Sequence, residues 1–482
     1  MGASRARLMT AIVTALLAVA TIGAAAPAAA GHHGSWTGAI SFWDRQQRID
    51  GFGFSQAFQR AAVINGLFGL PPERGQEVVD LLFDQRIGAG ASILRLGIGS
   101  SSDDVYDHMR SIQPEDPGGP DAPPRYVWDG YDGGQVWLAR EAAERGVRRF
   151  YADAWSAPGY MKTNGSDSNG GTLCGVPGAT CASGDWRQAY ANYLVQYLRF
   201  YAQEGIRITD LGFTNEPDLT TSYASMRFTP EQVVDFIHVL GPTLARSGLR
   251  TNLVCCDVAG WNEQIPYTEA IEADRLADAY VGIHSGHSYV SPADRPLPTD
   301  ATVWMSEWGP GGNVWDEGWD SGLPSAGITV AEDIHRTLTD ANANAYLFWL
   351  GASIGATRAL IQIDGENYHT SARLWAFAAY SRFIRPGAYR VTATAADEEL
   401  RVSAYRNLDG SRVIEIINVG RAATDADFRI DATSNRYRVN TYLTDDTHSL
   451  ERTDTASIRG DRLSVELPPR SLTTIVLTAR GA

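Results

Sequence analysis

Two glutamates in this sequence stand where paired carboxylates could do acid–base chemistry. Glu216 comes shortly after the apolar run at 211–213 and directly after Asn215, and Glu307 comes shortly after the apolar run at 303–305. A strand that only supplies core has no use for a charge at its tip, whereas a strand that ends at the rim of an active site does. Two carboxylates opposed across a cleft are what hydrolysis of a glycosidic bond requires. One must be protonated and the other ionised, so their surroundings must separate the two pKa values.

Each of these glutamates also has a purely structural interpretation. Glu216 would then cap the following helix or pair with an arginine, and Glu307 would form an ion pair between strands. The setting of Glu216, after an apolar strand and directly before Pro217, is a poor one for a mere surface charge. The sequence therefore favours a catalytic role for both carboxylates.

Strand-like and helix-like segments alternate between residues 49 and 385, and these elements must position the two glutamates. The segment at 71–86 is helical in pattern and begins with proline, and the segment at 186–205 is a long helix that ends in glycine. We count eight strands, with Glu216 ending the fourth and Glu307 ending the seventh. Such alternation means parallel pairing with right-handed crossovers. The predicted fold is therefore α/β, a (β/α)8 TIM barrel whose active site lies at the C-terminal ends of its strands.

The pattern changes to short strands after Pro386. Residues 386–482 contain period-2 apolar alternation separated by turns, with a hairpin signal at 408–410 and no helical pattern. This stretch predicts an all-β side domain, a β-sandwich. The strand-like segment at 31–48 is expected to join it.

The first 30 residues predict a secretory signal peptide. Two arginines precede an apolar stretch at 8–26, and the small residues at 27–30 fit a cleavage site. The alternative is a membrane anchor, which an Ala/Thr-rich run with no basic stop after it fits poorly. No second apolar stretch in the sequence is a membrane-span candidate. The protein is therefore expected to be secreted and extracellular, with no membrane partner.

Composition and charge narrow the class of partner. The chain has 482 residues with 44% apolar and 20% charged residues, which is ordinary for a globular protein. Loss of residues 1–30 removes two arginines and no acids, so the net charge goes from −15 to −17. Such a protein repels a phosphate polymer at long range, which argues against a nucleic-acid partner. We expect a monomer.

Four cysteines are compatible with disulfides in a secreted protein. Cys174 and Cys181 bracket six residues and are expected to close a small loop. Cys255 and Cys256 are adjacent on a predicted strand, where they are either free and buried or joined to each other. No cysteine spacing suggests zinc, and no metal site is expected.

An ordered set of motifs resembles glycoside hydrolase family 30, a family of barrel glycosidases whose catalytic carboxylates end strands four and seven. The matching motifs, in chain order, are DGFGFSQAFQRA, WSAPGYMK, TNEP, SEWG and FWLGA, with PPRSLTTIVL in the side domain. The resemblance covers essentially the whole mature chain. It implies that Glu216 is the general acid/base, that Glu307 is the nucleophile, and that anomeric configuration is retained. It also implies that Asn215 hydrogen-bonds the sugar 2-hydroxyl, and that no metal or organic cofactor is needed.

Four further residues are candidates for the sugar site. Arg95 lies on a strand that otherwise reads as core, so it needs a carboxylate partner, and Glu307 is the natural one; the pair would hold the nucleophile ionised. Its alternative role is a structural salt bridge. Tyr289 could hydrogen-bond Glu307, or be an ordinary rim tyrosine. Trp155 and Trp349 could form the floor of sugar-binding subsites, or they could be part of the barrel core.

The first-strand motif bears on the choice of sugar. It resembles the xylan-active branch of the family, in which an arginine of this motif binds the carboxylate of a glucuronic acid branch, and Arg60 would be that arginine. A guanidinium can grip a carboxylate bidentately. The alternative is that Arg60 forms a structural ion pair within its loop. The function expected from the sequence is a secreted retaining endo-β-1,4-xylanase that favours glucuronoxylan.

Two other functions stay open from the sequence. One is another family 30 specificity, such as xylobiohydrolase, endo-β-1,6-galactanase or β-1,6-glucanase. The other is a non-catalytic wall protein that uses its β-module to bind carbohydrate, which the intact pair Glu216 and Glu307 argues against.

Overall fold

The computed structural model describes residues 36–312, 314–355, 359–431 and 437–480. The predicted signal peptide at 1–30 and the first five residues of the segment predicted at 31–48 lie outside the described residues. Within the described ranges, no helix has both the length and the apolar character needed to cross a membrane.

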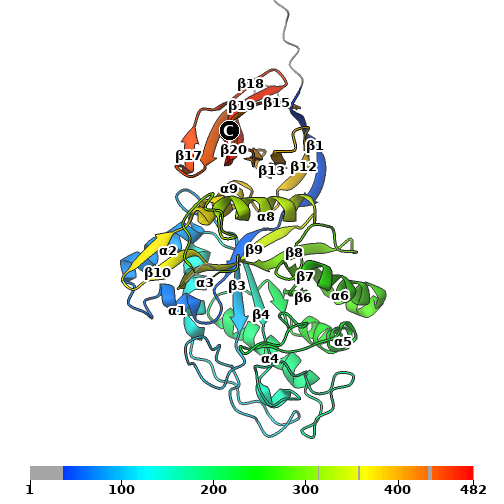
Figure 1. Ribbon diagram of the computed structural model, residues 1–482. Coiled ribbons are helices and arrows are strands. Elements are labelled where there is room, and N and C mark those ends of the chain that lie inside the picture. Colours follow the sequence, from blue (N-terminus) through cyan, green and yellow to red (C-terminus); the bar gives the residue numbers. More distant parts are fainter. Residues whose placement is uncertain (1–35, 313, 356–358, 432–436, 481–482) are drawn as a thin grey trace, which may run out of the picture. The chain divides into compact units, whose positions relative to one another are not determined.

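Eight parallel strands close into a barrel (Figure 1). They are β2 (Gly51–Ser55), β3 (Ile93–Ile98), β4 (Arg149–Ala154), β5 (Asp210–Gly212), β6 (Asn252–Val258), β7 (Val281–His287), β8 (Thr302–Trp308) and β9 (Ala345–Ile354). Each strand pairs with the next, and β9 pairs with both β8 and β2, which closes the ring. Two further strands, β10 (Ala359–Asp364) and β11 (Asn367–Thr370), extend the sheet from β9. The predicted barrel is confirmed.

Helices follow the strands and pack on the outer face of the barrel. They are α1 (Arg60–Ile64), α2 (Pro72–Phe83), α3 (Gln135–Glu144), α4 (Arg187–Gln203), α5 (Pro230–Arg246), α6 (Trp261–Ala273), α7 (Arg275–Tyr280), α8 (Gly327–Thr339) and α9 (Ala372–Phe383). Short 3-10 turns occur at Asp132–Gly134 and Gly159–Met161.

Helix α5, which follows the strand of Glu216, begins where local chemistry requires it. The side chain of Thr229 accepts from the backbone of Gln232, the side chain of Gln232 accepts from the backbone of Thr229, and Pro230 occupies the first helical position. This capping box satisfies two N–H groups that a helix start leaves without partners. The apolar residues Val233, Phe236, Ile237, Leu240 and Leu244 then repeat at helical spacing and are buried against the barrel.

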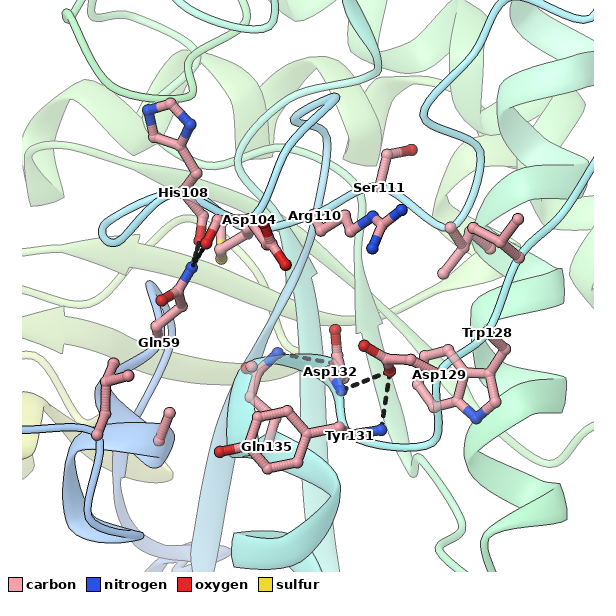
Figure 2. A pocket seen from close by; sticks show the side chains of 16 residues that line it. Gln59, Asp104, His108, Arg110, Ser111, Trp128, Asp129, Tyr131, Asp132 and Gln135 are labelled. Carbon is pink, nitrogen blue, oxygen red and sulfur yellow. Dashed lines mark hydrogen bonds between the residues drawn. The ribbon is translucent and has the colours of Figure 1, made fainter.

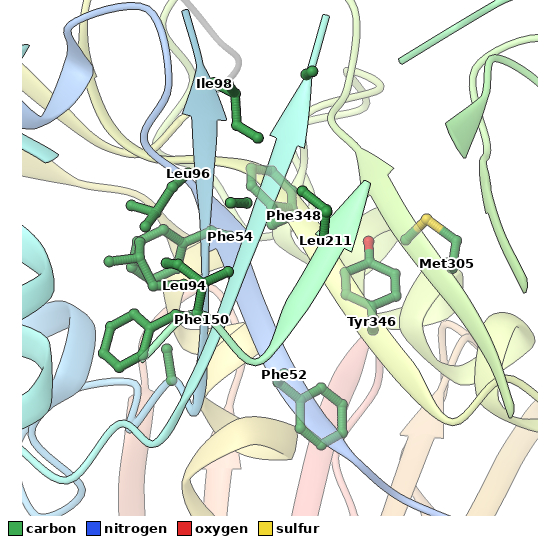
Figure 3. Packing of buried hydrophobic residues seen from close by; sticks show 14 of the residues in the cluster. Phe52, Phe54, Leu94, Leu96, Ile98, Phe150, Leu211, Met305, Tyr346 and Phe348 are labelled. Atoms are coloured by element: carbon green, nitrogen blue, oxygen red, sulfur yellow. The ribbon is translucent and has the colours of Figure 1, made fainter. Parts of the chain in front are cut away.

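The alternation of side chains along β3 decides what faces the barrel axis. Leu94 and Leu96 point outward into the core beneath the helices, together with Phe54 and Phe348 (Figure 3). The alternate residue Ile93 belongs to a separate inner cluster with Tyr151, Val254, Ile283, Trp304, Ala345 and Leu347. Arg95 lies two residues after Ile93, so it faces the interior one layer nearer the C-terminal end of the barrel.

The second sheet contains ten strands among the described residues, and all but one of its pairings are antiparallel. The strands are β1 (Gly38–Arg48), β12 (Tyr389–Ala395), β13 (Leu400–Arg406), β14 (Arg412–Asn418), β15 (Thr424–Ile430), β16 (Tyr437–Thr444), β17 (Ser449–Thr453), β18 (Ala456–Arg459), β19 (Arg462–Leu467) and β20 (Ser471–Ala479). β1 lies between β12, its antiparallel partner, and β15, its parallel partner. The strands enclose their own apolar core, and the predicted all-β side domain is confirmed.

Candidate active site

The two glutamates converge at the C-terminal end of the barrel. Glu307 lies in β8 and is 4% exposed, and Glu216 lies four residues beyond β5 and is 7% exposed. One side-chain atom each of Glu216, Glu307 and His287 lies within 4.8 Å of the others. The carboxylates therefore face each other across a gap that a glycosidic bond could occupy.

The backbone of Glu216 is held in an uncommon conformation. Its φ is +47°, in the left-handed region that residues other than glycine rarely adopt. Its N–H donates to the carbonyl of Asp257 at 2.8 Å, and Asp257 also has a positive φ. Such conformations persist where the surroundings enforce them and are concentrated at functional sites.

Two side chains donate hydrogen bonds to the carboxylate of Glu307. Arg95 Nη1 donates to its Oε2, and the hydroxyl of Tyr289 donates to its Oε1 at 2.7 Å. Both contacts are the ones that the sequence predicted. They orient the carboxylate, because each oxygen has its own donor.

Glu216 has different neighbours. The hydroxyl of Tyr223 donates to its Oε2 at 3.2 Å, and His287 Nδ1 lies 3.2 Å from its Oε1. Tyr223 is partly exposed in the loop that follows Glu216, and its sequence context carried no signal for this role. The two carboxylates thus meet unlike partners, as a division into acid and nucleophile requires.

Arg95 connects Glu307 to three neighbouring polar side chains. It is 0% exposed, and its Nη2 donates to Asp153 at 2.7 Å, to Asn215 at 2.6 Å and to Asp257 at 2.7 Å. Because Arg95 engages the side-chain oxygen of Asn215, the amide nitrogen of Asn215 is turned away from Arg95. That leaves the nitrogen as the group suited to donate to a ligand.

The charges of this buried cluster are uneven. Burial raises the pKa of Asp153 well above its ordinary value, which favours its neutral form. Burial acts in the same direction on Asp257, but the nearby Arg95 and His287 hold the pKa of Asp257 well below its ordinary range. Asp257 is therefore the carboxylate that permanently balances the two cations.

The pKa of Glu307 is raised from its ordinary value. Burial is the largest cause, and His287 and Arg95 oppose it. The sequence predicted that Arg95 would hold the nucleophile ionised. Arg95 acts in that direction, as predicted, although removal of the carboxyl group from water has the larger effect on the pKa. The two cations, Arg95 and His287, thus offset part of the free-energy cost of burying the carboxylate of Glu307.

His287 is a central residue to which sequence analysis assigned no role. It is fully buried, with Nδ1 beside Glu216 and Nε2 at 3.6 Å from Asp257 and 3.9 Å from Glu307. Burial alone would lower its pKa, but Glu307, Asp257 and Glu216 raise the pKa to about 10. The imidazole is thus a cation at neutral pH. The protonated imidazole and the carboxylates around it form a charge-paired cluster.

This charge pairing gives stability a specific pH dependence. The pKa of an unfolded histidine is about 6.5, below the folded value of about 10 for His287. Its stabilisation is therefore complete below pH ~6.5 and is lost as pH rises through about 10. We expect the free energy of unfolding to fall over this window in the wild type, and His287→Asn to lack most of that fall.

Denaturant unfolding across this pH window measures the effect. The control is His238→Asn, because His238 is partly exposed and pairs with Asp274 outside the site; this variant should keep the wild-type slope. Equal slopes for His287→Asn and the wild type would contradict the assignment of His287 as a buried cation.

Aromatic side chains line the approach to the carboxylates. Trp155 is 2% exposed and packs against the guanidinium of Arg95, whose carbon lies 4.4 Å from the ring centroid. Trp349 is half-buried, 6.0 Å from Trp155, and Phe58 packs edge-on against both. Trp155 is thus mainly part of the wall, and Trp349 is the better placed of the two to meet a sugar face. The sequence did not predict the role of Phe58.

Arg60 begins α1 and contacts a neighbouring loop. Its Nη1 lies 2.7 Å from a carboxylate oxygen of Asp107 and donates to the carbonyl of Phe58 at 2.7 Å, and its guanidinium lies over the ring of Tyr106. The alternative foreseen from the sequence, an ion pair within the loop region, is present. Asp107 is more than half exposed, so a competing carboxylate from solvent can reach this pair.

A cavity of about 340 Å³ lies next to this loop (Figure 2). Gln59, Asp104 and His108 line one side, and Trp128 and Tyr131 line the other. Gln59 Nε2 donates to the carbonyls of Asp104 and His108, which ties the start of α1 to the loop. The residues that line the cavity include neither Glu216 nor Glu307.

Two disulfides are present among the described residues. Cys174 is bonded to Cys181, as the sequence predicted, and the bridge closes the loop before α4. Cys255 is bonded to Cys256 in β6, directly before Asp257. Of the two possibilities foreseen for this adjacent pair, the structure has the bridge.

Two family models and one solved structure match most of this chain. The glycosyl hydrolase family 30 TIM-barrel domain matches residues 136–326, and the glycosyl hydrolase family 30 beta sandwich domain matches residues 387–475. The catalytic domain of GH30 xylanase C from Talaromyces cellulolyticus is 38% identical, with a TM-score of 0.85 over 92% of this chain and 99% of that chain.

Two curated relatives carry different names. Lysosomal acid glucosylceramidase of Mus musculus is 26% identical over 326 residues, 61% of this chain and 62% of the relative. Glucuronoxylanase XynC of Bacillus subtilis is 24% identical over 353 residues, 71% of this chain and 77% of the relative. The match thus spans about three fifths of the glucosylceramidase.

Proposed function

Because the chain belongs to glycoside hydrolase family 30, we propose that it is a secreted, retaining endo-β-1,4-xylanase that acts on glucuronoxylan. The observation that carries the mechanism is the short separation of the two carboxylates, with one side-chain oxygen of each within 4.8 Å. Retaining enzymes place their carboxyl groups ~5–5.5 Å apart, whereas inverting enzymes need ~6.5–9.5 Å to admit a water. The separation supports double displacement.

Each carboxylate then has a defined part in the reaction. Glu307 attacks the anomeric carbon while Glu216 gives its proton to the leaving oxygen, and a glycosyl ester forms on Glu307. Glu216, now ionised, takes a proton from water, which attacks the same carbon and frees Glu307. Tyr289 and Arg95 keep the nucleophile aimed, and the amide of Asn215 donates to the sugar 2-hydroxyl, a bond that strengthens in the transition state.

Xylan is the favoured substrate because of the similarity to xylanase C over nearly the whole chain. Secretion is supported by the signal-peptide pattern at 1–30 and by two disulfides, which persist in oxidising compartments. The glucosylceramidase relative favours a second candidate, hydrolysis of a β-glucoside of a lipid. That similarity is lower and covers less of the chain.

The product profile from glucuronoxylan tests the proposal, with the same polymer stripped of its uronic acid branches and glucosylceramide alongside. Branched oligomers of defined size, with much slower cleavage of the stripped polymer, are expected. Released disaccharide alone would mean exo action. Cleavage of glucosylceramide without cleavage of xylan would replace the proposal with the second candidate.

We propose that Arg60 binds the carboxylate of the glucuronic acid branch. That carboxylate would displace Asp107 as the ion-pair partner of Arg60. In Arg60→Ala, cleavage of glucuronoxylan should fall by about tenfold or more relative to the stripped polymer, because a charge-assisted contact contributes ~1.5–3 kcal/mol. Asp107→Asn is the matched control, since it breaks the same ion pair but leaves the guanidinium in place. The ratio of kcat/KM values on the two polymers measures the preference. An equal loss of preference in both variants would make Arg60 a structural residue.

A further inference from the structure

Two arginines at one end of the β-sandwich have donors that no described residue satisfies. Arg406 ends β13 and Arg412 begins β14, and the two are direct partners in the antiparallel ladder. Arg412 is 5% exposed, yet its Nε and Nη1 have no hydrogen-bond partner among the described residues. The same holds for Nη1 of Arg406. A buried guanidinium with empty donors is costly unless something binds it.

Aromatic rings surround these arginines, and Tyr437 also forms a side-chain hydrogen bond with Arg412, but Nε and Nη1 of Arg412 have no partner among the described residues. The guanidinium of Arg412 lies 4.5 Å from the ring centroid of Phe42 and 4.7 Å from that of Tyr437, and Arg406 lies 4.5 Å from that of Trp43. A ring over the face of a guanidinium stabilises the charge. The five donors lie in the guanidinium plane, so they remain directed sideways.

The local charge is not balanced either. The salt-bridge partner of this pair among the described residues is Asp431, whose Oδ1 is 3.7 Å from Arg412 and whose Oδ2 also accepts from Ser41. Arg406 adds a second positive charge, and burial together with that neighbour lowers the pKa of Arg412. Among the described residues, two guanidinium groups thus have one salt-bridge carboxylate between them, in a chain whose net charge is −15.

Trp43 supplies a platform beside the unfilled donors. It lies in β1 where the pairing with β12 is irregular, between Ser41 and Arg45, and it is 64% exposed although Arg406 lies over its ring. An exposed indole next to charged donors matches a sugar ring that carries a carboxylate. The ring stacks on the apolar face of the pyranose, and a carboxylate fits the planar fork of a guanidinium.

We propose that Trp43, Arg406 and Arg412 form a second carbohydrate site that binds a uronic acid residue of a polysaccharide. The choice of a sugar acid rests on the proposed function, whereas the need for an anion rests on the arginines alone. A nucleic acid is disfavoured by the strongly negative charge of the whole chain. The site would hold the acidic polymer on the side domain while the barrel cleaves it.

Binding without turnover tests the site. The full chain carrying Glu307→Gln is the parent, and two further variants add Trp43→Ala or Arg406→Gln to it. Each protein is run through native gels that contain either glucuronoxylan or the stripped polymer. Each added change should weaken binding to glucuronoxylan by about tenfold and leave binding to the stripped polymer nearly unchanged. In chains that keep Glu307, hydrolysis of a short unbranched xylo-oligosaccharide should be unaffected.

The same domain offers a matched control. Trp36 is also partly exposed beneath an arginine, Arg462, but this arginine pairs with Asp427 at 3.1 Å. Trp36→Ala should therefore not alter retardation. An equal loss in Trp36→Ala, or equal retardation of Trp43→Ala and its parent, would overturn the site. If the active enzyme fails to cleave xylan while Trp43→Ala still loses binding, the proposed function fails and this site stands.

Discussion

Replacing Glu307 by glutamine is expected to reduce turnover by about 10^4-fold or more, because the amide cannot form the glycosyl ester. Glutamine keeps one oxygen that can accept from Arg95, and its amide NH2 can donate to the hydroxyl oxygen of Tyr289, so the fold and sugar binding should persist. Steady-state kinetics on xylan and on an aryl xyloside measure the loss. Activity close to that of the wild type would end the proposed mechanism.

Azide rescue distinguishes the roles of the two glutamates, because azide can react in place of water or of a deleted carboxylate. In Glu216→Ala the glycosyl ester on Glu307 still forms from an aryl glycoside with a good leaving group, and azide attacks it to give a product of retained configuration. In Glu307→Gly azide takes the place of the nucleophile, and the product is inverted. The opposite pattern would exchange the roles of acid and nucleophile.

Replacing Arg95 by methionine is expected to lower the free energy of unfolding by about 3–5 kcal/mol at neutral pH. The cation that faces Asp153, Asp257 and Glu307 would be lost from a site that is 0% exposed, and buried carboxylates would remain without it. Activity should also be lost, since the nucleophile loses the donor to its Oε2.

The cost of Arg95→Met should shrink in acid. In the wild type Arg95 and His287 hold the pKa of Asp257 low, and this stabilisation is lost as pH falls through the folded pKa. Without Arg95 the pKa of Asp257 rises, so the variant protonates earlier and loses less stability between neutral and acidic pH.

Denaturant unfolding at about pH 3 and about pH 7 checks this difference, because the contribution of Asp257 is lost only as pH falls below its unfolded pKa of ~3.9. Arg149→Met is the matched control, because Arg149 pairs with Asp50 and Asp210 on the same barrel outside the catalytic cluster. It should cost stability without the same loss of activity. A pH-independent cost for Arg95→Met would contradict the charge assignment.

The sequence by itself determined the architecture and singled out the two glutamates proposed as the reacting groups. Alternating strand and helix patterns are local signals, and each element of the barrel carries its own, as the capping box at Thr229 shows. Glu216 and Glu307 stood out because a charge directly after an apolar strand is rare for a residue with only a structural role. Arg95 stood out as an arginine on a strand that otherwise reads as core, and Tyr289 as a hydrogen-bond donor near Glu307; the predicted contacts of both with Glu307 are present.

Only the tertiary structure decided how these groups are charged and surrounded. His287 meets Glu216, Asp257 and Glu307 because three further strands and their loops converge on it. Irregular register after Cys256 and after Gly286 breaks the period-2 rule just where Asp257 and His287 turn inward. Trp155 is mostly buried, and Arg60 pairs with Asp107, because loops distant in sequence cover them. Contacts of this kind depend on closing the barrel, which brings side chains from all eight strands to one axis, and no local pattern encodes them.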